Sequence, residues 1–127
     1  MSESNIKFKN LVDKLFYSTS SSSIVWSLTD ENYPFCIIAD YKIVLTSGVD
    51  YEGEPMEYIT IYNLDGHTVD SFNDNSISAF KPQMGQSFHN YWKVMESLRE
   101  MAVRQATGAD KAIDEIIDAL NDNDVPF

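Results

Sequence analysis

The chain opens with a helical pattern of hydrophobic positions. Apolar residues at Phe8, Leu11, Val12, Leu15 and Phe16 follow the spacing that gathers side chains on one face of a helix. The pattern predicts a helix over residues 4–17. The Ser/Thr run at residues 18–23 favours local hydrogen bonds from side chain to backbone. We therefore expect this run to be the connection that leaves the helix.

The middle of the chain is rich in β-forming residues. Candidate strands lie at residues 24–29, 35–46, 57–62 and 68–72, separated by turn-forming stretches that contain Pro34, Gly53 and Gly66. The long segment 35–46 is compatible with two strands bent near Asp40 and Tyr41, or with one strand that contains a bulge. Four or five strands joined by short turns predict an antiparallel meander.

Helical spacing returns in the last third of the chain. The apolar positions of the first of two helices are Phe88, Tyr91, Trp92, Met95, Leu98 and Ala102. Thr107 and Gly108 then interrupt the pattern, either as a glycine stop or as the start of a capping box. The final stripe consists of Ile113, Ile116, Ile117 and Leu120, with Asp114, Glu115 and Asp118 facing water. The order predicts an α+β domain, residues 1–120, with the helices packed on one face of the sheet, followed by an acidic tip, residues 121–127.

The composition indicates a folded domain, and the net charge limits the kinds of partner that it can bind. The 127 residues are 43% hydrophobic and 13% aromatic, which is enough to form a core and argues against a disordered acidic protein. The formal net charge is −11, from 20 acidic and 9 basic residues. Direct binding to nucleic acid or to an anionic membrane requires a basic face. We therefore expect neither.

The lone cysteine and the chain start favour a cytosolic protein. Cys36 has no partner for an internal disulfide, and its apolar surroundings predict a buried thiol with a raised pKa. The sequence contains neither a run of about 18 apolar residues nor a basic segment followed by an apolar one at its start. We expect a cytoplasmic protein with no membrane partner.

Acidic residues are concentrated in the predicted hairpins. Residues 48–85 carry seven acids and one base, a net charge of −6. The seven acids are Asp50, Glu52, Glu54, Glu57, Asp65, Asp70 and Asp74. They are compatible with a solvated rim that keeps the protein in solution. Alternatively, they form a surface that imitates a phosphate backbone and occupies the basic groove of a nucleic-acid-binding protein, such as a nuclease.

Catalytic motifs are not evident in the sequence. His67 adjoins a predicted turn and His89 lies near a helix start, so neither is placed beside a nucleophile and an orienting group. The acids show no short, fixed ligand spacing for a metal, and the five glycines match no nucleotide-binding fingerprint. We expect a protein without enzymatic activity, metal or cofactor.

The C-terminal residues carry the most specific pattern. Asp122, Asp124, Val125, Pro126 and Phe127 resemble the acidic tip of bacterial single-stranded-DNA-binding proteins, in which acids precede an aliphatic residue, proline and a terminal phenylalanine. In such a tip the Phe127 ring and α-carboxylate form a compact ligand, proline limits the entropy lost on docking, and the acids attract a basic rim. Asn121 and Asn123 interrupt the acidic run, and the flexible linker of that family is missing.

The resemblance covers only the tip, because the acidic body opens with a helix where that family has a nucleotide-binding barrel. It implies a protein that copies the ligand: an adaptor, decoy or inhibitor that binds a basic protein of DNA replication, repair or defence. The two alternatives are a nucleic-acid mimic acting through the acidic hairpins, and a small acidic secretion or assembly chaperone. The sequence leaves the oligomeric state open, although such a chaperone is expected to dimerise.

Overall fold

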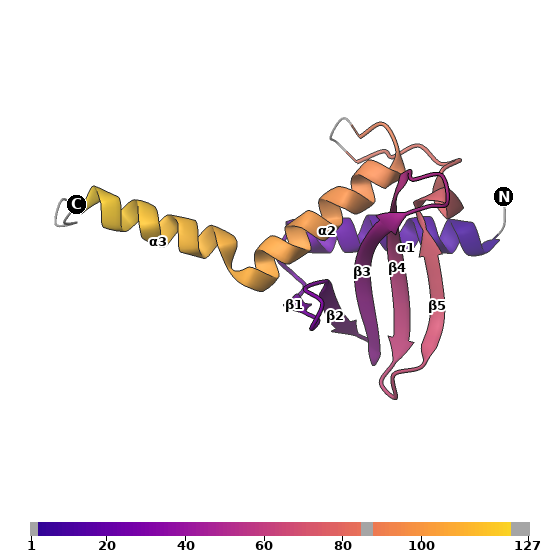
Figure 1. The fold of residues 1–127 in the computed structure, drawn as a ribbon, viewed down its shortest axis with the longest axis horizontal. Helices are drawn as coiled ribbons and strands as arrows, with labels where there is room; N and C mark the ends of the chain where they lie inside the picture. Colours follow the sequence, from indigo (N-terminus) through magenta and orange to yellow (C-terminus); the bar gives the residue numbers. More distant parts are fainter. Residues whose placement is uncertain (1–2, 85–87, 123–127) are drawn as a thin grey trace.

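One antiparallel sheet and three α-helices form the structure (Figure 1). The computed structural model describes residues 3–84 and 88–122. Its elements are α1 (Glu3–Ser20), β1 (Ser27–Leu28), β2 (Pro34–Ile38), β3 (Tyr41–Val49), β4 (Pro55–Asn63), β5 (Thr68–Asn73), the 3₁₀ helix η1 (Asp74–Ile77), α2 (Tyr91–Thr107) and α3 (Ala109–Asn121). The strands pair in sequence order, β1-β2-β3-β4-β5. The predicted α+β class and the meander are confirmed.

Two strands, rather than one bulged strand, occupy the segment that the sequence left open. A two-residue turn at Ala39 and Asp40 joins β2 to β3, with Ile38 paired to Tyr41. Both turn residues have left-handed φ angles, 53° and 66°, as expected where the turn must match the right-handed twist of the strands.

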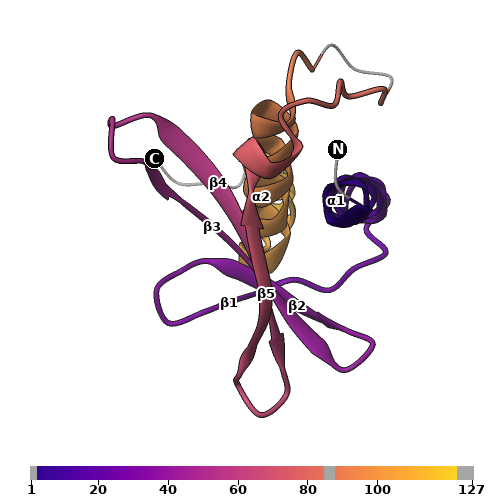
Figure 2. The same ribbon diagram turned by 90° about the vertical axis from the view of Figure 1, so that its right-hand side faces the viewer.

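The core lies between one face of the sheet and the helices α1 and α2. Alternate strand residues point into it, among them Cys36, Ile43, Leu45, Ile59 and Phe72, in line with the two-residue period of a strand. Figure 2 shows α1 beside α2. The Tyr91 hydroxyl donates a hydrogen bond of 2.8 Å to Asp13 and thereby joins the two helices.

The first helix is longer than predicted, because its serine and threonine side chains find partners within the fold. α1 continues to Ser20, whose hydroxyl donates to the Phe16 carbonyl at 2.8 Å. Thr19 is buried and its Oγ1 accepts a hydrogen bond of 3.1 Å from Trp26 Nε1. The contact of Thr19 with Trp26, which lies outside the helix, therefore offsets the weak helix propensity of Thr19.

Gly108 separates α2 from α3 and acts as a glycine stop. Its φ of 69° is left-handed, and its amide donates to the Arg104 and Gln105 carbonyls, which is the usual helix ending. α3 then begins with no side-chain cap, and Asp110 pairs with Arg104 instead of completing a capping box.

The last helix differs from α1 and α2 in its burial. Every residue from Asp110 to Asp122 is exposed, and Figure 1 shows α3 extending from the end of α2 away from the sheet. The apolar stripe of α3 is therefore not part of the core. Within the described ranges, no helix is long and apolar enough to cross a membrane.

Cys36 provides a test of the core. Burial leaves this residue 1% exposed and raises the pKa of its thiol to about 12, so both access and thiolate content are low at neutral pH. We expect a thiol-specific reagent at pH 8 to label the native protein at least 100-fold more slowly than the protein in denaturant. Equal rates would show that this side of the core opens readily.

Candidate interaction surfaces

One acid of the segment 48–85 belongs to a buried ion pair. Glu57 on β4 is 4% exposed and forms a two-pronged pair with Arg99 of α2: Nε to Oε1 at 2.7 Å and Nη2 to Oε2 at 3.0 Å. Asp74 is also buried, and its Oδ1 accepts a hydrogen bond of 2.9 Å from the Glu57 amide. Burial raises the pKa of Glu57, against the opposing effect of the Arg99 guanidinium.

These contacts correct the expectation that all seven acids of residues 48–85 belong to one exposed surface. Glu57 and Asp74 lie on the helix-covered side of the sheet and take no part in an exposed acidic surface. Asp50 stabilises its own turn, because its Oδ1 accepts hydrogen bonds from the Glu52 and Glu54 amides at 2.8 and 3.0 Å. Asn63 performs the same role in the next turn, where it accepts from the Asp65 and His67 amides.

The exposed acids are divided between two ends of the sheet. Glu52 and Glu54 are at the β3–β4 turn, and Asp65 is at the β4–β5 turn, which lies at the opposite end (Figure 1). The nine residues of β4 separate the two turns, a span of about 30 Å at about 3.3 Å per residue. Asp70 is exposed within β5. This placement disfavours a single phosphate-like surface.

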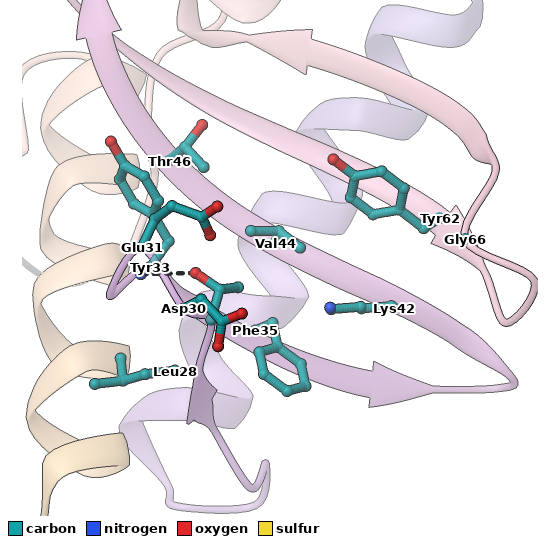
Figure 3. A pocket seen from close by; sticks show the side chains of 11 residues that line it. Leu28, Asp30, Glu31, Tyr33, Phe35, Lys42, Val44, Thr46, Tyr62 and Gly66 are labelled. Atoms are coloured by element: carbon teal, nitrogen blue, oxygen red, sulfur yellow. Dashed lines mark hydrogen bonds between the residues drawn. The ribbon is translucent and has the colours of Figure 1, made fainter.

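A mixed polar and aromatic hollow lies on the sheet beside the β1–β2 turn. Its volume is about 690 Å³, and residues of the turn and of β2, β3 and β4 line it. Lys42 Nζ lies 4.5 Å from the centre of the Phe35 ring. Figure 3 shows Asp30 and Glu31 on the turn, and Tyr62 on β4, the strand next to that of Lys42.

The hollow is lined by several kinds of polar group. Its lining carries one amine, two carboxylates, two phenols and two threonine hydroxyls, and it includes neither of the histidines nor Cys36. Within residues 3–84 and 88–122, no cluster of three or more His, Cys, Asp or Glu residues could hold a metal ion. Absence of enzymatic activity remains a prediction.

A second, apolar hollow lies between α1 and β2. It has a volume of about 610 Å³ and is lined mainly by aliphatic side chains, including Leu11, Ile24 and Ile37, with Lys14 beside them. Val25, at its edge, is 86% exposed, and Ile37 is 59% exposed. In the sequence, the uninterrupted apolar run Phe35–Ile38 is the feature that could have indicated this hollow. A strand with apolar residues on both faces is typically covered by other elements on both faces.

The residues of the predicted tip are described in part. Asp122 is the C-cap of α3; its amide donates to the Ala119 carbonyl and the residue is exposed. Asp124, Val125, Pro126 and Phe127 lie outside the described residues. The structure thus places the start of the tip at the free end of an exposed helix.

Comparisons of the chain with protein-family models, with curated proteins and with solved structures found no match. The functional argument therefore depends on the surfaces described above.

Removal of Arg99 tests the buried pair. Arg99→Met leaves the Glu57 carboxylate buried without its cation, which should lower the free energy of unfolding by about 3 kcal/mol. The loss should be greater at pH 8 than at pH 5. The Arg99 guanidinium lowers the pKa of Glu57 against the effect of burial, so its removal raises that pKa further. The folded variant then holds the Glu57 proton more tightly than its unfolded state does, and it loses stability as the pH rises through that pKa.

Denaturant titrations at the two pH values measure both effects. Arg104→Met is the matched control, since Arg104 lies on the same helix but pairs with the exposed Asp110, and its loss should change stability by at most about 0.5 kcal/mol. Equal losses for the two variants would contradict a stabilising role for the Glu57 pair.

Proposed function

We propose that this protein is an acidic interaction protein without enzymatic activity, an adaptor, decoy or inhibitor. Its C-terminal segment, residues 122–127, docks on a basic protein that acts on nucleic acid in replication, repair or defence. The observation that supports this proposal is the position of α3: an exposed helix leads from the folded body to the Asp122 end of that segment.

The projecting helix replaces the flexible linker that precedes such tips in single-stranded-DNA-binding proteins. The 13 residues of α3 extend about 20 Å at about 1.5 Å per residue. Its far end lies well away from the sheet (Figure 1). A partner can therefore surround the segment without meeting the body of the domain.

Charge supports a basic partner. α3 and its C-cap carry Asp110, Asp114, Glu115, Asp118 and Asp122 against Lys111, within a chain of net charge −11. Such a field speeds encounter with a basic surface, and it weakens as salt is added. Val125, Pro126 and Phe127 supply the apolar anchor, which gives the contact its specificity.

The test compares the full chain with a chain that ends at Val125. Each is used as bait in bacterial lysate, and captured proteins are quantified by mass spectrometry. Because burial of one phenylalanine contributes about 1.5–3 kcal/mol, we expect recovery of the tip-dependent partner to fall at least tenfold. A synthetic peptide of residues 121–127 should compete for the same partner.

The control variant is Glu52→Gln/Glu54→Gln, which removes two exposed acids at the β3–β4 turn and leaves the tip intact. It should capture the partner as the full chain does. If truncation has no effect and the turn variant loses the partner, the folded acidic surface carries the function and the proposal fails.

A further inference from the structure

The mixed polar and aromatic hollow beside the β1–β2 turn lies on the face of the sheet opposite to the core. Lys42 and Val44 alternate along β3 with the core residue Ile43, so their side chains point away from the core. Val44 is only 7% exposed, although it is not part of the core cluster. Side chains around Val44 therefore enclose a hollow on this face of the sheet.

Two aromatic side chains lie close to Lys42 within the hollow. Phe35 is paired with Val44 across β2 and β3, and Tyr62 is paired with Lys42 across β3 and β4. Side chains of such pairs lie on the same face of a sheet, with Cβ atoms about 5 Å apart. The Lys42 ammonium lies 4.5 Å from the centre of the Phe35 ring. This cation–π contact holds the amine inside the hollow.

The β1–β2 turn adds two carboxylates to the hollow. Thr29 closes the turn, because its amide donates to the Tyr33 carbonyl at 2.8 Å and its Oγ1 accepts from the Tyr33 amide at 3.1 Å. Asp30 and Glu31 follow Thr29 in this turn, and both line the hollow (Figure 3). A turn that is already closed presents its carboxylates with little further loss of backbone entropy on binding.

The charged groups of the hollow are not paired with one another. Among residues 3–84 and 88–122, no ion pair includes Lys42, Asp30 or Glu31. One ammonium and two carboxylates in one hollow match a molecule that carries one anionic and two cationic groups. The net charge of the chain, −11, also attracts a ligand with an excess of positive charge.

We propose that this hollow binds a basic α-amino acid. Lys42 binds the α-carboxylate, while Asp30 and Glu31 bind the α-ammonium group and the side-chain cation. Charge-assisted hydrogen bonds of this kind are among the stronger ones, and aromatic rings in the lining provide faces on which a planar guanidinium stacks. The volume of about 690 Å³ lies in the usual range for small-molecule sites.

An NMR titration of the ¹⁵N-labelled full chain with L-arginine tests the proposal. We expect saturable shifts of amides in the β1–β2 turn and in β3 near Lys42, with a dissociation constant of about 1 mM or lower. The chain that ends at Val125 should bind arginine equally well, because the hollow is formed by the sheet and not by residues 122–127. Failure of this proposal and failure of the proposed function are therefore distinguishable.

Agmatine, which is arginine without its carboxylate, separates recognition from attraction to net charge. Agmatine carries more positive charge than arginine, so attraction to the acidic chain alone predicts tighter binding of agmatine. Recognition of the carboxylate by Lys42 predicts the reverse, and we expect agmatine to bind about tenfold more weakly or worse. Agmatine that binds as tightly as arginine would overturn the proposal.

Two variants address the two charges of the hollow. Lys42→Met keeps the apolar stem and removes the ammonium, and Asp30→Asn/Glu31→Gln removes both carboxylates while conserving their shape. Each should weaken arginine binding about tenfold or more. Lys42→Met should also bind agmatine at least as well as the parent chain does, because it removes a cation from the hollow. The dispersion of the NMR spectrum verifies that each variant is folded.

The matched control is Glu52→Gln/Glu54→Gln, which removes two exposed acids at the β3–β4 turn and changes the net charge as the Asp30/Glu31 variant does. It should bind arginine as the parent chain does. Equal weakening by the control and by the Asp30/Glu31 variant would overturn the proposal. An absence of shifts in the hollow at about 10 mM arginine, well above the expected dissociation constant, would also overturn it.

Discussion

The packing of α2 against the sheet is the constraint on which the remaining surfaces depend. Apolar residues such as Val94 and Leu98 bury one side of this helix, the Arg99–Glu57 pair fixes it to β4, and the Tyr91–Asp13 hydrogen bond joins it to α1. The direction of α2 then sets the direction of α3, because only Gly108 separates the two helices. Residues at the core thereby determine where the exposed C-terminal helix points.

The protein combines a high negative charge with little concentration of that charge on the sheet. Glu57 and Asp74 are used in the interior, and Asp50 organises its own turn. Exposed acids lie at the turns at both ends of the sheet, within β5, on α1 and α2, and along α3. A charge spread in this way acts at long range, attracting basic proteins and repelling acidic ones.

In the proposed function, residues 122–127 recognise the partner. The acidic chaperone alternative shares small size and net charge with this chain. The contribution of Pro126 and Phe127 to partner capture separates that alternative from a tip-dependent adaptor or inhibitor.

Periodicity determined the elements of this fold. The spacing of Phe8, Leu11 and Leu15 predicts α1, and the stripe of Ile113 and Ile117 predicts α3, because these patterns repeat locally along the chain. Sequence also predicts that Cys36 is buried, since its neighbours are apolar. These features depend on residues close together in the chain, so local chemistry is sufficient.

Tertiary structure decided which residues meet and which remain uncovered. Arg99 and Glu57 are 42 positions apart, and nothing in the acidic block distinguishes Glu57 from Glu54 until β4 turns one face to α2. Likewise, the stripe of α3 predicts a buried face, but its exposure follows from the direction in which α2 ends. Periodicity shows that a face is apolar; only the arrangement of the elements in space determines what covers it.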